Sequence, residues 1–151
     1  MADVQVSLLT YLYNLLTTNT ALKTAMGGAV RCYPVSAPPD SAFPYLVHRI
    51  DAGPPGGIWP ERNSTYQLDV WSQDPAAHDI TAIRNRLVLI LDELVFNTTD
   101  VKNVRPELQT DGFITENDVR QPGSAMNIWH YALQFNLPYY RQTETTSILA
   151  R

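Results

Sequence analysis

The segment from residue 43 to residue 96 limits the fold of this chain more than any other part of its sequence. Residues 44–52 and 64–73 both alternate between apolar and polar side chains, which is the period-two pattern of half-buried strands. The stretch between them, residues 53–63, is rich in glycine and proline and carries Trp59. Two alternating strands joined by such a stretch predict an antiparallel hairpin with a long loop.

A long apolar helix is predicted directly after this hairpin. Asp74 and Pro75 indicate its start, because aspartate caps a helix N-terminus and proline fits the first helical position. The apolar residues that recur at helical spacing before the predicted end at Phe96 are Ile80, Ile83, Leu87, Leu91, Leu94 and Val95. Residues 88–90 are also apolar, so we expect a helix that is either deeply buried in the core or packed on two sides, as at a dimer seam.

Weaker signals precede this block. Leucines at helical spacing predict a first helix that begins after Asp3 as its cap. Thr20 is expected to cap a short second turn, which Gly27 and Gly28 end because glycine accepts a left-handed backbone. Residues 30–33 then predict a short strand.

The second half of the chain predicts further strands. Residues 101–119 are strand-like, with a hairpin signal at Asp111-Gly112. Residues 127–137 alternate clearly, with large apolar side chains on one face, and Pro138 is expected to end that strand.

This order of elements predicts one α+β domain over residues 1–138, followed by a C-terminal tail or arm over residues 139–151. We expect a mostly antiparallel, mixed sheet of about four to five strands, packed against an N-terminal helix and one long central helix. A length of 151 residues agrees with one domain.

The composition argues against several classes of protein. The net charge is −4 and basic runs are missing from the sequence, so a phosphate-neutralising grip on nucleic acid is not expected. The single cysteine, Cys32, excludes an internal disulfide. No apolar run reaches the ~18 residues of a membrane span, and no signal peptide is visible, so we expect a soluble protein. Only 17% of residues are charged, which together with eight tyrosines favours a surface covered by a partner.

The search for chemistry gives weak signals. His48, His78 and His130 lack the spacing of metal ligands, and Cys32 is interpreted as a small buried apolar residue. Residues 53–57 contain glycines without a phosphate-binding motif. Asp51 and Asp69 could face each other across the hairpin, although a solvated sheet face is the favoured interpretation.

Two stretches then carry a resemblance: "AMGGAVRCYPVSAPPDSAFPYLVHRI" and, after a loop, "YQLDVWSQDPAAHDITAIRNRLVLILDEL". Together they resemble the tail-completion or tail-terminator family of long-tailed bacteriophages, over roughly residues 8–94 and more loosely to residue 137. The fold markers that match are Tyr45, Asp69 and Trp71.

The resemblance implies a structural virion protein that forms a homohexameric ring, caps the completed tail tube and provides the joining surface to the head–tail connector. It implies no catalytic residues, no metal site and no cofactor. The implied partners are other copies of the chain, the tail-tube protein and a connector or stopper protein. DNA would only pass through the lumen without specific binding, and an acidic lumen would repel it. No membrane contact is implied. The implied location is the tail or neck of the virion, and the host cytoplasm during assembly.

Two other functions stay open at this stage. One is another neck component, such as a head-completion protein or connector adaptor, which tends to be more helical. The other is a small ligand-binding or enzymatic domain that uses His48, Asp69 and His130 on one sheet face.

We expect the loop after residue 52 and the start of the tail to form the interface with neighbours. The predicted interface residues are Gly53, Pro54, Pro55, Gly56, Gly57, Ile58, Trp59, Pro60, Glu61, Arg62, Tyr139, Tyr140 and Arg141.

Overall fold

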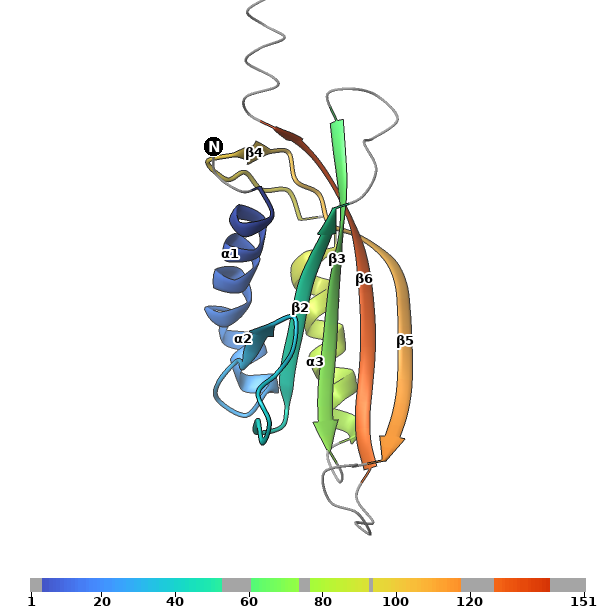
Figure 1. Cartoon of the computed structure of the whole chain (residues 1–151). Helices are drawn as coiled ribbons and strands as arrows, with labels where there is room; N and C mark the ends of the chain where they lie inside the picture. Colours follow the sequence, from blue (N-terminus) through green and yellow to red (C-terminus); the bar gives the residue numbers. More distant parts are fainter. Residues whose placement is uncertain (1–3, 53–60, 74–76, 93, 118–126, 142–151) are drawn as a thin grey trace, which may run out of the picture.

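The computed structural model describes residues 4–52, 61–73, 77–92, 94–117 and 127–141, which form one layer of strands and one layer of helices (Figure 1). The helices are α1 (Val4–Thr17), α2 (Thr20–Ala25) and α3 (Ala77–Leu91). The strands are β1 (Cys32–Pro34), β2 (Tyr45–Ala52), β3 (Glu61–Gln73), β4 (Val101–Lys102), β5 (Glu107–Asn117) and β6 (Asn127–Arg141). The prediction of one α+β unit with a mixed, mostly antiparallel sheet is therefore confirmed. The sheet has six described strands where about four to five were expected, and the predicted short second turn forms a third helix.

The sheet is built around β3 and β6. Its order is β1-β2-β3-β6-β4, and β5 pairs with β6 as well. Only the β1–β2 pair is parallel among the pairs of the described strands. The predicted hairpin is confirmed, because β2 and β3 pair antiparallel with Tyr45 opposite Trp71 and Ala52 opposite Ser64.

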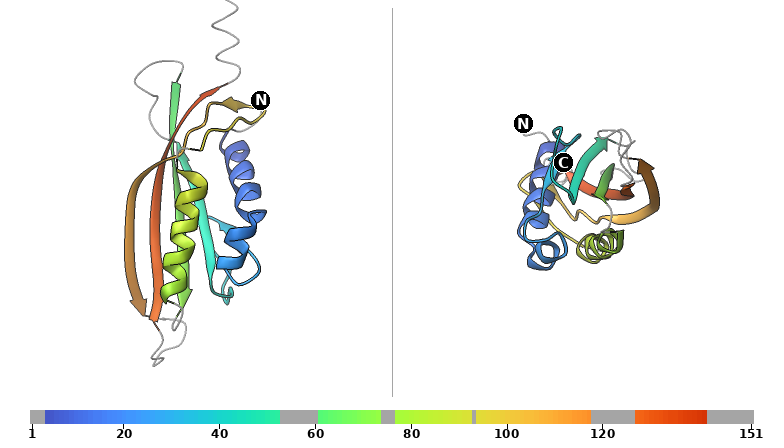
Figure 2. Two further views of the ribbon diagram at one scale, coloured as in Figure 1. Left: turned by 180° about the vertical axis from the view of Figure 1, so that it is seen from behind. Right: turned by 90° about the horizontal axis from the view of Figure 1, so that it is seen from below.

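The core lies between one face of this sheet and the helices. Helix α1 contributes Leu8, Leu12 and Leu16, whose spacing of four residues places them on one stripe. Helix α3 contributes Ile80, Ile83, Leu87 and Leu91, and the left view of Figure 2 shows it on one face of the sheet, running along the strands. The fully buried side chains that face them from the two central strands are Tyr66, Leu68, Val70, Leu133, Phe135 and Leu137. The predicted alternation of both strands is thus confirmed.

The cap of the second helix lies one residue earlier than predicted. Asn19 is the N-cap, with an extended backbone and a side-chain oxygen that accepts a hydrogen bond from the Leu22 N–H at 2.9 Å. Thr20 lies inside the helix. The predicted stop is confirmed: Gly27 and Gly28 have φ of 85° and 114°, which L side chains rarely adopt.

The long helix is shorter than predicted. Its predicted start at residues 74–76 lies outside the described residues, and it ends at Leu91 rather than at Phe96. After the helix the chain turns back on itself, and the backbone of Phe96 pairs with Val104 through hydrogen bonds of 3.1 and 2.9 Å. The Asp92 carboxylate also accepts a hydrogen bond from the Leu108 N–H, at 3.1 Å. These contacts replace the helical bonds that the pattern predicted.

Asp111-Gly112 does not form the predicted turn. β5 continues through both residues, which pair with Leu133 and Ala132 of β6. The Asp111 carboxylate forms an ion pair with Arg84 of α3, so its position in the strand is fixed by tertiary contact. The irregularity of β5 falls earlier, where the register shifts between Leu108 and Thr110.

Pro138 does not end β6, which continues to Arg141. Proline lacks an N–H, but its carbonyl oxygen still accepts a hydrogen bond from the Arg105 N–H at 3.2 Å. Tyr139 to Arg141 therefore belong to the sheet, and the predicted tail begins later than residue 139. The first strand also differs slightly, since it covers Cys32–Pro34 rather than residues 30–33.

Candidate interaction surface on the uncovered face of the sheet

One face of the sheet carries α1 and α3, and the described helices leave the opposite face uncovered (Figures 1 and 2). We call the opposite face the open face. Side chains alternate along each strand, so the buried Leu68 and Val70 of β3 point to the core, whereas Asp69 and Trp71 point to the open face. The pairing of Trp71 with His130 places His130 on the same face.

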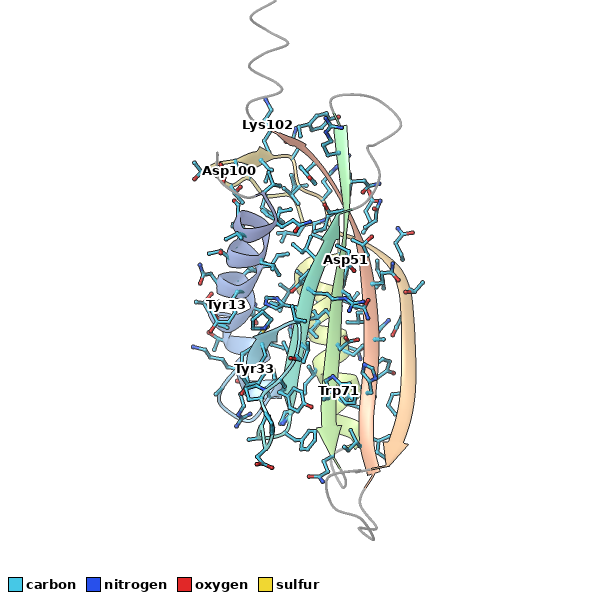
Figure 3. All side chains as sticks on the ribbon, viewed as in Figure 1. Tyr13, Tyr33, Asp51, Trp71, Asp100 and Lys102 are labelled. Carbon is cyan, nitrogen blue, oxygen red and sulfur yellow. The ribbon has the colours of Figure 1, made fainter. Side chains whose placement is uncertain are left out.

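Aromatic rings form a row across one end of the open face. This aromatic row consists of Tyr33, Phe43, Tyr45, Trp71 and His130, which come from β1, the loop after it, β2, β3 and β6. Its ring centroids are 6.1 Å apart for Tyr33 and Tyr45, 5.2 Å for Phe43 and Tyr45, and 6.3 Å for Tyr45 and Trp71. Figure 3 shows Trp71 near the end of β3 and Tyr33 towards the β1 edge.

The last two members of the row are held most firmly. The His130 and Trp71 rings stack with centroids 3.9 Å apart and an angle of 9° between their planes. His130 Nε2 lies 3.1 Å from Asp69 Oδ1, and a carboxylate can only accept, so Nε2 carries the proton. The Asp69 carboxylate thereby fixes the orientation of the imidazole against the indole. The row is thus a preorganised apolar surface with a polar side.

The middle of the open face is polar. Arg49 donates a hydrogen bond to Gln67 at 3.2 Å and lies 3.5 Å from the Asp51 carboxylate. Asp51 is opposite Thr65 and Asp69 is opposite Val47, so the two acids do not face each other across the hairpin. Next to this region is a hollow of about 460 Å³. Its lining is uncharged and consists of Thr65, Gln109, Thr110, Gln134, Phe135 and Asn136.

The other end of the sheet brings predicted interface residues together. Glu61 pairs with Tyr140, Arg62 pairs with Tyr139, and Arg141 pairs with Val101 of β4. Gly53, Pro54, Pro55, Gly56, Gly57, Ile58, Trp59 and Pro60 lie outside the described residues. Because β2 ends and β3 begins where β6 ends, the loop and the tail that were predicted as interface elements leave the sheet at the same end.

His48 is separated from the other two residues of the predicted enzymatic cluster. It lies on the core side of β2, is 3% exposed, and its Nδ1 is 2.8 Å from the Tyr66 hydroxyl. Burial lowers the pKa of His48 from 6.5 to about 4, so the buried ring is neutral. Burial, and to a lesser extent nearby Cys32, raises the pKa of Tyr66. The proposed cluster of His48, Asp69 and His130 is not assembled.

Cys32 lies in the same interior. Its side chain is buried, as predicted, and burial raises the pKa of its thiol to about 12. Among the described residues there is no group of three histidine, cysteine or acidic side chains that could hold a metal ion. In the same part of the chain, no helix has the length and apolar character needed to cross a membrane.

Sequence reasoning missed the aromatic row as a unit. It placed Tyr45 and Trp71 only as fold markers and gave no role to Tyr33 or Phe43. The signal was present in part, because the alternation puts Tyr45 and Trp71 on the polar side of their strands. Their alignment depends on the register between strands, which the local pattern does not contain.

No family model matches this sequence, and no curated protein matches it either.

Proposed function

We propose that this chain is a structural subunit of a bacteriophage tail, a tail terminator whose ring caps the tail tube and joins the head–tail connector. The observation that carries the proposal is the open face with its aromatic row. Aromatic side chains that bridge several strands and keep part of their surface in solvent are typical of protein contact sites. A subunit of a closed ring needs such a surface for a neighbour.

The chemistry of the described residues supports a structural role. The ionisable side chains with strongly shifted pKa values are His48, Tyr66 and Cys32, and all three are buried in the core. Active sites commonly place such groups beside a space that a substrate can enter. The hollow on the open face has an uncharged lining instead.

The geometry of the predicted interface residues also supports assembly. Arg62 and Tyr140 lie at one end of the sheet, and the aromatic row lies at the other. Tyr139, at the same end as Arg62, is buried in the core of its own copy. One copy therefore offers two separate surfaces for contacts. Head-to-tail rings and stacking on a tube both need different surfaces on one chain.

The test is a binding experiment with assembled tail tubes. We expect the chain to bind tube ends and to give a hexamer mass by light scattering, either alone or on the tube. Trp71→Ala should weaken the assembly by at least about 2 kcal/mol, as expected for an aromatic residue at the centre of an interface. Trp71→Phe is the matched control, because it keeps an aromatic ring on the open face and should retain most of the binding.

A chain that stays monomeric at all concentrations and does not bind tube ends would exclude this function. Location in the virion separates the terminator from another neck component: electron cryomicroscopy should place the chain between tube and connector. A position inside the connector would favour the adaptor.

A further inference from the structure

The strand β5 is an edge of the sheet. It has 11 residues, and among the described residues only β6 pairs with it (Figure 1). Consecutive residues of a strand direct their backbone N–H and C=O groups to opposite sides. About half of the β5 groups therefore point away from β6, which makes β5 a template for one more strand.

The two edges of the sheet are built differently. At the opposite edge, β1 has three residues and ends at Pro34, and Pro38 and Pro39 follow it. A short strand with prolines is a common protection against pairing with other chains. Over its whole length β5 contains neither proline nor lysine. Its irregularity, between Leu108 and Thr110, leaves residues 110–117 in regular register with β6.

An exposed aromatic residue marks the same edge. Phe113 of β5 is 47% exposed although it packs against two rings of β6. Its centroid is 5.5 Å from Trp129 and 4.9 Å from Tyr131. Its remaining surface would be covered by an apolar side chain on a strand added beside β5.

The chain itself contains a segment with the chemistry of such a strand. Residues 142–151 read QTETTSILAR and have one acidic and one basic residue. They contain the β-branched Thr143, Thr145, Thr146 and Ile148, which favour strands. Proline and glycine are missing from the segment. Ile148 and Leu149 offer apolar side chains on either face.

We propose that the free edge of β5 binds residues 142–151 of a neighbouring copy as an added strand. In its own copy the segment follows Arg141, which pairs with Val101 of β4. β4 and β5 pair with the same side of β6, and β4 lies beside the end of β6 from which the segment continues. This arrangement favours pairing of the segment with β5 of a neighbouring copy rather than with β5 of its own copy. Donor and acceptor are different surfaces, so repeated exchange is head-to-tail and can close a ring. The inference rests on the proposed function, because it names the contact between subunits.

Hydrogen exchange on the full-length chain tests this contact directly. The exchange of β5 amides is compared between a dilute solution and the assembled state, alone or on tail tubes. We expect protection to increase at alternate residues between Thr110 and Asn117, because only the outward N–H groups gain a partner.

Proline variants give the matched comparison. Ser147→Pro and Ile148→Pro remove two consecutive N–H groups, one of which points to β5 in an extended strand. We expect one or both to weaken self-association at least tenfold while the melting temperature of the domain stays unchanged. Ile148→Val keeps the strand propensity and should change association less than about twofold.

The same logic applies to the acceptor strand. Thr115→Pro and Glu116→Pro also remove consecutive N–H groups. The variant that removes an N–H bonded to β6 should lower the melting temperature of the domain. The variant that removes an outward N–H should leave the melting temperature unchanged and weaken self-association. Equal behaviour of the two variants would contradict an edge contact.

The outcomes separate the two proposals. Rings on tail tubes without increased protection in β5 would overturn this inference and leave the proposed function standing. If the β5 amides gain protection from hydrogen exchange on self-association but the chain does not bind tail tubes, the inference is supported and the proposed function is excluded. The inference would also be overturned if Ser147→Pro and Ile148→Pro both self-associated as strongly as the wild-type chain.

Discussion

The buried pair of His48 and Tyr66 makes the stability of this protein depend on pH. The pKa of His48 is about 4 in the folded chain, against 6.5 for an ordinary histidine, because burial penalises the charged ring. Between these two values the unfolded chain binds a proton that the folded chain does not. The free energy of unfolding therefore falls as the pH is lowered from about 6.5 to about 4.

The size of the effect follows from the difference between the two pKa values. A difference from 6.5 to about 4 corresponds to about 3 kcal/mol of stability, which is fully present above pH 6.5 and lost near pH 4. His48 is 3% exposed, so solvent does little to reduce the free-energy cost of a charge on its ring. About 3 kcal/mol is a large part of the 5–15 kcal/mol that is typical of a domain.

The assay is urea unfolding at a series of pH values between 4 and 7.5. The double variant His48→Leu with Tyr66→Phe removes the titrating ring and its partner together, so it leaves neither group unsatisfied. We expect the free energy of unfolding of the double variant to depend less steeply on pH between about 4 and 6.5, because the His48 contribution is missing. Tyr66→Phe alone should keep most of that slope, because burial rather than the hydrogen bond lowers the pKa. A slope that is identical in the wild-type chain and the double variant would refute this reasoning.

Three further predictions concern the helices and the core. Asn19→Ala removes the cap of α2 and should cost about 1 kcal/mol in urea unfolding, whereas Asn19→Ser, which can still accept the Leu22 N–H, should cost less. Leu12→Ala should cost about 2–5 kcal/mol, since Leu12 is fully buried; a cost below 1 kcal/mol would contradict its place in the core. Cys32 should resist alkylation in the native protein at pH 8 and react within minutes in urea, as measured by mass spectrometry, because its thiol is buried with a pKa of about 12.

Much of the fold could be predicted because its signals are local. The alternation around Tyr66 and Leu68 identified β3 and its buried face, and the spacing of Leu8, Leu12 and Leu16 identified α1. These patterns depend only on the period of a strand or a helix, which any residue shares with its near neighbours in sequence. The glycine stop after α2 is equally local.

The errors share one cause, which is pairing with another segment that the local pattern does not reveal. Phe96 was assigned to the helix, but its backbone bonds to Val104. Asp111-Gly112 has the composition of a turn, but its strand pairs with β6 and its carboxylate meets Arg84. Pro138 would end an isolated strand, yet Asn63 lies opposite it within a long ladder. In each case pairing with another segment outweighed one local preference.

The candidate site shows the same division. By itself, the sequence determined which residues of each strand share a face, and so that Tyr45, Asp69 and Trp71 point away from the core. Only the tertiary structure decided that Tyr33, Trp71 and His130 form one row, and that β5 is left at an edge. The reason is physical: side-chain alternation is fixed within a strand, whereas strand order and register are fixed by the packing of the whole sheet.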